Sequence, residues 1–181
     1  MTIHLLLGPM YAGKSSELIR RMRRFQHAGK STFLIKHKHD IRYNTNNQKL
    51  STHDQLKIEC DYATDTKLMD DNNLSNKIKD VHVICIDEGQ FFPDIDLFAE
   101  HYANLGKIII IAALDSDFQR KPFNKIIELI SKSEEYVKFT AVCNCGSDAA
   151  FTKRITNEKE HILIGGSDKY SAVCRVCYFK K

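Results

Sequence analysis

The segment GPMYAGKS, from Gly8 to Ser15, spaces two glycines, a lysine and a serine as required to enclose phosphate groups. Its glycines let the backbone curl, so that amide N–H groups surround phosphate oxygens at the positive end of the following helix. Lys14 adds a cation, and the Ser15 hydroxyl is a ligand for Mg²⁺. The sequence therefore predicts a P-loop for nucleotide phosphates, formed by Gly8, Pro9, Met10, Tyr11, Ala12, Gly13, Lys14 and Ser15.

Two adjacent carboxylates, Asp87 and Glu88, follow the apolar run 81–86. A P-loop needs a second acidic residue at the end of a neighbouring strand to hold Mg²⁺, and Asp87 has that position. Neighbouring side chains of an extended chain point to opposite sides, so we expect Glu88 to face an acceptor hydroxyl and take its proton. The alternative is that Glu88 caps a loop or pairs with a surface lysine.

Four cysteines are concentrated in the last quarter of the chain, as the pair Cys143 and Cys145 and the pair Cys174 and Cys177. Four thiolates would bind a structural Zn²⁺ tetrahedrally and leave no open position for chemistry. The first pair has one residue between its cysteines where zinc sites usually have two or more, so its backbone must bend more sharply. Reduced core thiols and a labile disulfide are the alternatives.

The bulk composition is that of an ordinary globular protein, with 181 residues, 43% hydrophobic and 28% charged. A net charge of +4 is too weak to indicate nucleic-acid binding, although it suits a polyanionic ligand such as a nucleotide. No apolar run approaches the roughly 20 residues of a membrane span, and the N-terminus lacks signal-peptide features. We therefore expect a cytoplasmic protein with reduced thiols, no nucleic-acid partner and no membrane association.

Strand and helix patterns alternate along the first three quarters of the chain. Strands are expected at 3–7, 31–37, 56–63, 81–86 and 107–114, and helices from the P-loop to Gly29 and at 66–79, 94–105 and 121–132. Residues 40–54 are polar and irregular, which predicts an exposed loop. Seven consecutive apolar residues at 108–114 indicate a strand buried on both faces. The pattern predicts an α/β fold: a P-loop NTPase-type, mainly parallel sheet flanked by helices, with a small C-terminal zinc-binding domain.

From about Tyr136 the pattern changes to short strand-like pieces and paired cysteines. We therefore expect a P-loop domain at 1–137 and a small zinc-binding domain at 138–181. Within the first helix, four arginines lie opposite the apolar stripe formed by Leu18, Met22 and Phe25. The arginines indicate a solvated face, and a phosphate or partner contact is the alternative. They are Arg20, Arg21, Arg23 and Arg24.

Several blocks together resemble the type II thymidine kinases, nearly from end to end and in the right order: GPMYAGKSSELIRR, DIRY, IDEGQFFPDI, ALDSDFQRKPF, TAVC, TKR, IGGSDKY and VCRVCYFKK. DEGQFFPD and FQRKPF are far more specific than a P-loop alone. The resemblance implies transfer of the ATP γ-phosphate to the 5′-hydroxyl of thymidine or deoxyuridine, giving dTMP from thymidine in pyrimidine salvage for DNA synthesis. It also implies feedback inhibition by dTTP, a homotetramer, and a C-terminal domain whose loop closes over the nucleoside.

The resemblance also implies residue roles. Glu88 takes the place of the general base and Asp87 the magnesium-binding position, while Asp40, Arg42 and Gln90 belong to the ATP-binding region. Gln90, together with Phe91, would also border the deoxyribose and the base. The pocket around the sugar and thymine would be formed by Met10, Phe91, Leu114, Phe118, Phe123 and Tyr170. The loop whose backbone reads the base edge would comprise His161, Ile162, Leu163, Ile164 and Gly165. For Phe118 and Tyr170, simple packing is the alternative.

One departure and two rival functions remain. The family's first zinc pair is usually Cys-x-x-Cys, so Cys145 would ligate through a rearranged turn, or a neighbour such as Asp148 would help. One rival is a P-loop ATPase with a zinc ribbon that remodels nucleic acid. The other is a non-catalytic nucleotide-binding module. Neither explains DEGQFF together with FQRKPF.

Overall fold

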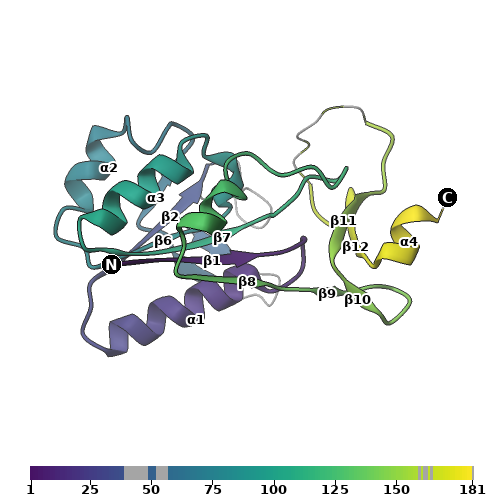
Figure 1. Ribbon diagram of the computed structural model, residues 1–181, viewed down its shortest axis with the longest axis horizontal. Coiled ribbons are helices and arrows are strands. Elements are labelled where there is room, and N and C mark those ends of the chain that lie inside the picture. Colours follow the sequence, from purple (N-terminus) through teal and green to yellow (C-terminus); the bar gives the residue numbers. More distant parts are fainter. Residues whose placement is uncertain (39–48, 52–56, 159, 161–162, 164, 181) are drawn as a thin grey trace.

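The computed structural model describes residues 1–38, 49–51, 57–158, 160, 163 and 165–180. Figure 1 shows a central sheet with helices on its faces and a smaller C-terminal part beside one end of it. Most of the loop predicted at 40–54, with Asp40 and Arg42, lies outside the described residues. Within that stretch, residues 49–51 form a short strand, β3 (Lys49–Ser51), which pairs with β4 (Lys57–Glu59) in an antiparallel hairpin.

The central sheet has six strands in the order β5-β2-β6-β7-β1-β8, and every neighbouring pair is parallel. Parallel neighbours require crossover connections, which the intervening helices and loops supply. This confirms the predicted α/β class with a mainly parallel sheet flanked by helices. The strands are β1 (Thr2–Leu7), β2 (Thr32–His37), β5 (Tyr62–Thr64), β6 (Val83–Ile86), β7 (Ile108–Ala113) and β8 (Glu135–Lys138).

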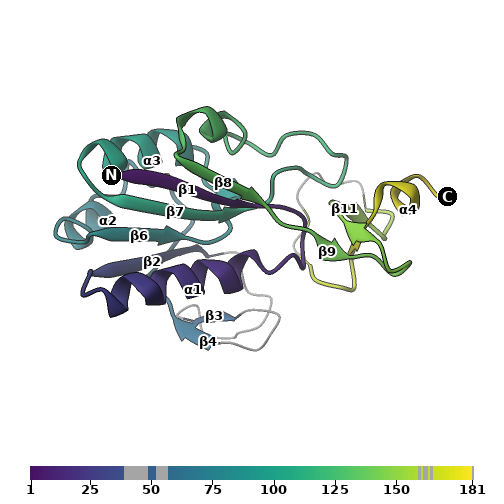
Figure 2. The same cartoon turned by 60° about the horizontal axis from the view of Figure 1, so that its bottom comes forward.

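Helices cover both faces of this sheet (Figure 2). Helix α1 (Lys14–His27) packs on one face, and α2 (Asn72–Lys77) with α3 (Ile95–Asn104) packs on the other. Alternate residues of β7 contribute to the two cores, because successive side chains of a strand point to opposite sides. Ile110 lies in the core beneath α1 and Ile111 in the core beneath α3, and both are fully buried. The prediction of a strand buried on both faces is confirmed.

Helix α1 has the apolar stripe that its sequence predicts. Leu18 and Met22 are buried against the sheet, and Phe25 packs beside them. The helix ends before Gly29, whose φ of 73° lies in the left-handed region that favours glycine after a helix C-terminus. Among the helices that the structure describes, none is both long enough and apolar enough to cross a membrane.

The single strand predicted at 56–63 is wrong, because the chain turns at Asp61. Its carboxylate accepts a hydrogen bond from the Leu34 amide at 2.7 Å, and its own amide donates to the Leu34 carbonyl at 3.1 Å. These contacts bring the chain onto the edge of β2. Residues 57–59 therefore form β4 of the hairpin, and Tyr62–Thr64 forms β5 of the central sheet.

Two predicted helices are shorter or absent. Within 66–79 only α2 forms, because the Asp94 carboxylate holds the Leu68 and Met69 amides in a loop. The helix predicted at 121–132 is wrong: only a 3₁₀ helix, η2 (Glu128–Lys132), forms there. Asn124 has a φ of 49°, in the left-handed region, which an α-helix cannot contain.

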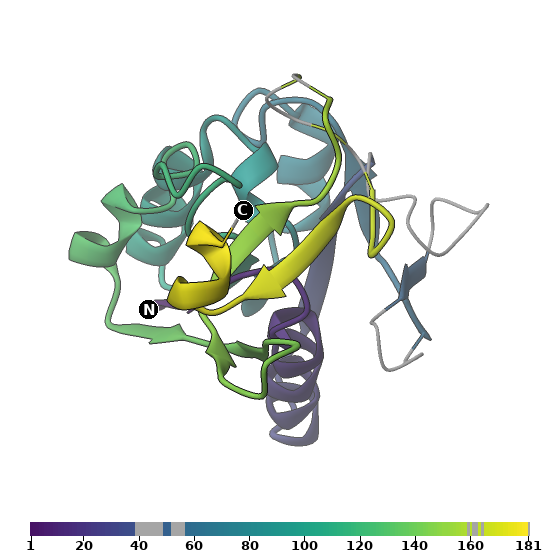
Figure 3. The same ribbon diagram turned by 90° about the vertical axis from the view of Figure 1, so that its right-hand side faces the viewer.

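The C-terminal part consists of short strands and one short helix: β9 (Ala141–Val142), β10 (Asp148–Ala149), β11 (Phe151–Arg154), β12 (Tyr170–Val173) and α4 (Arg175–Phe179). Figure 3 looks onto this part and shows β11 beside β12, with α4 in front. Its small core includes Ala141, Ala149 and Ala172, and it also includes Ala12 of the P-loop. The C-terminal part therefore packs directly against the phosphate-binding segment. A domain boundary at 137/138 stays a prediction.

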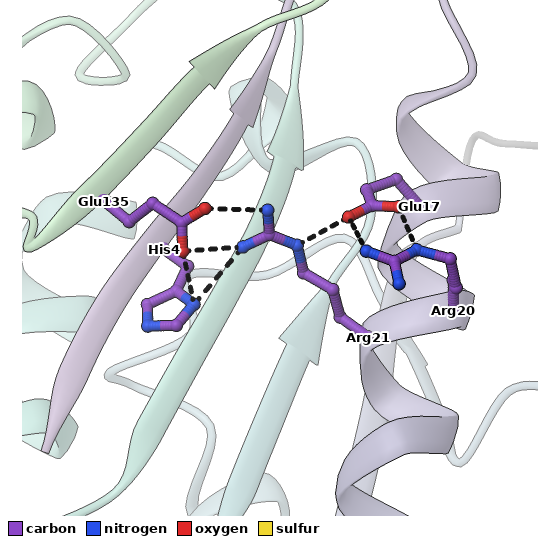
Figure 4. A network of polar contacts seen from close by, with 5 residues as sticks. All are labelled: His4, Glu17, Arg20, Arg21 and Glu135. Carbon is purple, nitrogen blue, oxygen red and sulfur yellow. Dashed lines mark hydrogen bonds and ion pairs between the residues drawn. The ribbon is translucent and has the colours of Figure 1, made fainter.

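The four arginines of α1 do not share one environment. Arg21 is only 13% exposed, and its guanidinium bonds the carboxylates of Glu17 in α1 and Glu135 in β8 (Figure 4). His4 of β1 lies against the same Glu135 carboxylate at 3.3 Å. Arg20 is exposed and bonds Glu17. The prediction of a solvated face is wrong for Arg21, which ties α1 to the edge of the sheet.

We expect Arg21→Ala to lower the free energy of unfolding by about 1–2 kcal/mol at pH 7, because two carboxylates lose a charged partner. Hydrogen bonds from Arg20 and Arg21 lower the pKa of Glu17 to about 2 from an ordinary 4.5. The stabilising contribution of Glu17 is thus fully present above pH 4.5 and is lost as the pH falls towards 2. Urea unfolding measured between pH 4.5 and pH 2 gives the free energy of unfolding of wild type and Arg21→Ala. The difference between these two free energies should become smaller as the pH falls.

The matched control for this prediction is Arg20→Ala, which should lower the free energy of unfolding at pH 7 by less than Arg21→Ala does. Arg20 is exposed and bonds the Glu17 carboxylate, whereas the less exposed Arg21 bonds the carboxylates of both Glu17 and Glu135. Equal losses for the two variants, or a difference that does not change with pH, would contradict a structural role for the network of Arg21.

Candidate active site and zinc centre

The P-loop connects β1 to the first residue of α1 and is built around two glycines with positive φ. Gly8 has a φ of 140°, and a Cβ placed there would lie 2.5 Å from the Phe139 carbonyl oxygen. Gly13 has a φ of 78° immediately before α1. Any larger residue at Gly8 would push the chain after β8 away, so this glycine is required for the close approach of two segments.

Lysine and serine at the end of the loop point to different partners. The Lys14 ammonium donates to the Pro9 carbonyl at 2.7 Å, across the mouth of the loop. The Ser15 hydroxyl donates to the Asp87 carboxylate, with Oγ 2.9 and 3.0 Å from its two oxygens. Asp87 follows β6, is only 3% exposed, and lies 72 residues from Ser15 in the chain. The fold therefore brings together the two side chains that the sequence predicts at one magnesium position.

Glu88 is separated from Asp87 by a turn of the backbone. We predicted this separation from the alternation of an extended strand, but β6 ends at Ile86 and Glu88 has a φ of 52°. That left-handed conformation begins η1 (Gly89–Phe91). The Glu88 carboxylate accepts a hydrogen bond from the Gln90 side-chain amide, while Asp87 bonds Ser15. The carboxylates of Asp87 and Glu88 thus have different partners, as predicted. The cause is the left-handed backbone of Glu88 and not the alternation of an extended strand.

The segment after Glu88 is fixed by close packing. Gly89 lies against β7, where an added Cβ would be 2.6 Å from the Ile111 side chain. Gln90 is buried, and its side-chain oxygen accepts from the Leu114 amide at 3.0 Å. The ring of Phe91 packs edge-on against Phe123, with 5.9 Å between centroids. Because the Gln90 side chain is held by protein groups, its assignment to the ATP-binding set stays a prediction.

A second group of predicted pocket residues contacts Arg154. Arg154 itself was not predicted as a site residue from the sequence. The Arg154 guanidinium lies 3.8 Å from the centre of the Phe118 ring and donates to the Tyr170 hydroxyl at 2.8 Å. The Tyr170 hydroxyl in turn donates to the Leu163 carbonyl at 2.9 Å. Arg154 also donates to the carbonyl of Glu158 at 3.1 Å and to that of Glu160. Its place in the TKR block was the only sequence signal.

The P-loop is tied to this second group. The Met10 amide donates to the Thr152 hydroxyl at 3.0 Å, and the Tyr11 hydroxyl donates to the Tyr170 carbonyl at 3.3 Å. Met10 is buried, whereas Leu114, Phe118 and Phe123 are each partly exposed. Gly165 is described and partly buried, but His161, Ile162 and Ile164 lie outside the described residues. The fold thus joins the phosphate loop to the C-terminal strands that carry Arg154 and Tyr170.

All four predicted zinc ligands converge. The sulfurs of Cys143, Cys145, Cys174 and Cys177 lie within 4.8 Å of one another, and those of Cys145 and Cys174 are 3.6 Å apart. A tetrahedral Zn²⁺ with Zn–S bonds of about 2.3 Å needs sulfur separations of roughly 3.8 Å, so the donor set and the spacing both fit. All four thiols are free, and 3.6 Å is far beyond the roughly 2 Å of a disulfide bond.

The short first pair closes through a tight turn. The Gly146 amide donates to the Cys143 carbonyl at 2.8 Å, and Gly146 has a φ of 86° that a glycine adopts without strain. The Cys143 amide donates to the Ser147 carbonyl at 2.9 Å, which completes the β9–β10 hairpin. This turn places the Cys145 sulfur beside the other three, and Asp148 is not part of the cluster among the described residues.

Hydrogen bonding shifts the pKa values of two of these thiols in opposite directions. Hydrogen bonds with Ser147 and with the neighbouring thiols lower the pKa of Cys145 to about 6. Hydrogen bonds with the other three cysteines raise the pKa of Cys177 to about 12. In the second pair, the Cys174 sulfur accepts from the Cys177 amide at 3.4 Å at the start of α4. Four cysteine sulfurs that converge in this way are typical of structural zinc sites.

A parallel sheet whose first strand leads through a glycine-rich loop into a helix, with a buried acid at the end of a nearby strand, defines the P-loop nucleotide-binding class. Residues 1–178 match the family model described as thymidine kinase, and the chain belongs to the thymidine kinase family. The resemblance inferred from the motifs is therefore confirmed, and the protein is an enzyme of this kinase family.

Named relatives are similar over nearly the whole chain. The thymidine kinase of Sheeppox virus is 53% identical over 178 residues, covering 98% of this chain and 96% of that protein. The cytosolic thymidine kinase of Homo sapiens is 51% identical over 180 residues, covering 99% and 74%. Thymidine kinase 1 of Dictyostelium discoideum is 49% identical over 182 residues, covering 97% and 77%. The similarity thus spans both the P-loop part and the cysteine cluster.

Proposed function

We propose that the protein transfers the γ-phosphate of ATP to the 5′-hydroxyl of thymidine, and of deoxyuridine, giving dTMP from thymidine in pyrimidine salvage for DNA synthesis. Membership of the thymidine kinase family supports this reaction. The observation that carries the assignment of roles is the bond from Ser15 to Asp87, with Glu88 turned to a different partner. A metal-binding pair and a separate carboxylate are the two functions that phosphoryl transfer to a hydroxyl requires.

Phosphate binding is assigned to backbone N–H groups of the loop Gly8–Ser15, at the N-terminus of the long helix α1. Pro9 has no N–H, and the Met10 N–H donates to the Thr152 hydroxyl, so these two residues are excepted. The amides and the helix dipole supply positive charge to the β- and γ-phosphates, and Lys14 adds its ammonium. Binding would require Lys14 to exchange its bond with the Pro9 carbonyl for one with a phosphate. The family resemblance adds Asp40, Arg42 and Gln90 to this ATP-binding set.

The Ser15 hydroxyl and the Asp87 carboxylate are oxygen donors of the kind that Mg²⁺ prefers, so they would hold the metal that accompanies ATP. When bound, Mg²⁺ supplies charge neutralisation to the phosphates. Glu88 is proposed to orient the 5′-hydroxyl and accept its proton as the phosphoryl group is transferred. Most of the rate enhancement would come from positioning and electrostatics rather than from covalent chemistry.

Selection of thymine is assigned to an apolar pocket and to backbone groups of the loop over it. The pocket comprises Met10, Phe91, Leu114, Phe118, Phe123 and Tyr170, and the loop comprises His161, Ile162, Leu163, Ile164 and Gly165. Backbone groups that match O4, N3–H and O2 would reject cytosine, whose donor and acceptor are reversed at two of these positions. Each unmatched buried polar group costs about 1–3 kcal/mol, so two mismatches exclude cytosine strongly.

We further propose that a structural Zn²⁺ bound by the four cysteines stabilises the C-terminal part, residues 138–181, which closes over the nucleoside. Feedback inhibition by dTTP, a homotetramer, a cytoplasmic location, and the absence of nucleic-acid and membrane partners belong to the same proposal.

Incubation with labelled ATP, Mg²⁺ and each of the four deoxynucleosides, followed by identification of the products, tests this function. We expect labelled dTMP from thymidine and no product from deoxycytidine, deoxyadenosine or deoxyguanosine. Phosphate release stimulated by DNA, with no nucleoside phosphorylated, would favour a nucleic-acid-dependent ATPase. ATP binding without any product would favour a non-catalytic module.

Arg154→Ala should raise the KM for thymidine about tenfold or more, while the KM for ATP changes less than about twofold. The reason is that one guanidinium contacts the Phe118 ring, the Tyr170 hydroxyl and two carbonyls of the segment between β11 and β12. Steady-state kinetics with each substrate varied in turn is the measurement. Arg175→Ala, an exposed arginine on α4, is the control and should leave both constants unchanged. An equal rise in both KM values for Arg154→Ala would contradict the prediction.

A further inference from the structure

The segment that carries Glu88 is held in place by the buried side chain of Gln90. Gln90 is 1% exposed, and its amide has two partners on different elements. The Nε2 group donates to the Glu88 carboxylate, and Oε1 accepts from the Leu114 amide at 3.0 Å. Leu114 directly follows β7, the strand buried at the centre of the sheet. Gln90 therefore links the Glu88 carboxylate to a rigid element of the fold.

Further contacts restrict the backbone of the same segment. The Asn124 side chain donates to the carbonyls of Gln90 and Phe92, at 3.3 Å each. Gly89 lies against Ile111 with no room for a side chain. Since the backbone on both sides of Gln90 is fixed, its side-chain amide has little freedom. The orientation of the Glu88 carboxylate, which begins this turn with a φ of 52°, then depends on that amide.

We propose that Gln90 is a positioning residue for phosphoryl transfer, which aims the Glu88 carboxylate at the acceptor hydroxyl without contacting the phosphates itself. This inference rests on the proposed function, because it assigns Gln90 a role through the base Glu88. It differs from the ATP-binding assignment that the family resemblance gave to Gln90. The bond from the Gln90 amide restricts the direction in which the Glu88 carboxylate points, and a general base must be held within hydrogen-bond reach of the proton it accepts.

The first test asks whether replacing Gln90 changes kcat or the KM for ATP. Gln90→Leu removes both hydrogen bonds at nearly constant volume. We expect kcat for thymidine to fall about tenfold or more, because small misplacements of a reacting group are costly, while the KM for ATP stays within about twofold. A rise in the KM for ATP with an unchanged kcat would overturn the proposal and favour nucleotide contact.

Gln90→Glu is a second variant that guards against simple misfolding. Its carboxylate keeps an acceptor for the Leu114 amide but replaces the donor to Glu88 with a like charge. We expect a larger fall in kcat than for Gln90→Leu, since the two carboxylates repel each other. The same exchange at Gln119, which is exposed on the neighbouring loop, is the matched control and should leave kcat unchanged.

The second test is a double-mutant cycle with Glu88→Gln, in which the residual rate is measured at high enzyme concentration. If Gln90 acts through Glu88, Gln90→Leu should lower kcat less than about twofold once Glu88 is replaced. Equal losses in both backgrounds would overturn the proposal and indicate a general structural role. Absence of thymidine phosphorylation by the wild type would instead refute the proposed function, so the two failures are distinguishable.

Discussion

Glu88→Gln is expected to lower kcat for thymidine phosphorylation by about 10²- to 10⁴-fold, the usual contribution of a general base. The glutamine keeps the shape of the side chain, and its amide oxygen can still accept the hydrogen bond from Gln90. It has no basic carboxylate, so it cannot take the proton of the 5′-hydroxyl. Single-turnover kinetics with saturating ATP and thymidine is the measurement.

The affinity for ATP separates this result from a loss of substrate binding. In Glu88→Gln, the dissociation constant of Mg²⁺-ATP should stay within about twofold of wild type. Asp87→Asn is the informative comparison, because Asp87 bonds Ser15 at the proposed metal position. It should require more Mg²⁺ for half-maximal activity. A Glu88→Gln protein with near-normal turnover would remove Glu88 from the role of base.

Cys174→Ser is the second change with a large expected effect, and the effect should fall on folding. Cys174 is buried in the small core that also contains Cys143 and Ala12 of the P-loop. A serine cannot replace the thiolate, and structural zinc supplies much of the folding free energy of a small irregular unit. We expect the variant to lose zinc and its melting temperature to fall by about 10 °C or more.

Metal analysis of the purified protein gives the matching measurement, with one zinc per chain expected for wild type. Cys60→Ser is the control, because Cys60 lies outside the cysteine cluster and its thiol donates to the carbonyls of Leu34 in β2 and Tyr62 in β5. It should keep the zinc. A Cys174→Ser protein that is well folded, free of zinc and fully active would contradict the structural role.

The parts of the site that could be predicted are those formed by short sequence motifs. The P-loop and the four cysteines could be found because each motif places its atoms locally, and the P-loop needs only a strand before it and a helix after it. The meeting of Ser15 and Asp87 followed from the parallel α/β class, since strands of a parallel sheet end at the same edge. The central sheet was predictable from the alternating strand and helix patterns, and its buried strand β7 from the seven consecutive apolar residues at 108–114.

What was missed depends on contacts between distant segments. The helix expected at 121–132 has an apolar pattern, but Asn124 is held by two carbonyls of the Glu88 segment and adopts a left-handed conformation. Arg154 gathers its partners from three segments, and no local spacing indicates this. The strand at 56–63 was divided by the side chain of Asp61. For Asn124 and Asp61, a side chain bonded to a remote backbone group overrode the local pattern.

The most direct test of the account is a crystal structure of the protein with Mg²⁺, a non-hydrolysable ATP analogue and thymidine. The measured quantities are the distances from the Glu88 carboxylate to the sugar O5′ and to the metal. We predict a hydrogen bond of about 2.6–3.2 Å to O5′, with Asp87 and Ser15 at the metal. A structure in which both carboxylates surround the ion, or in which Glu88 lies far from the sugar, would contradict the central claim.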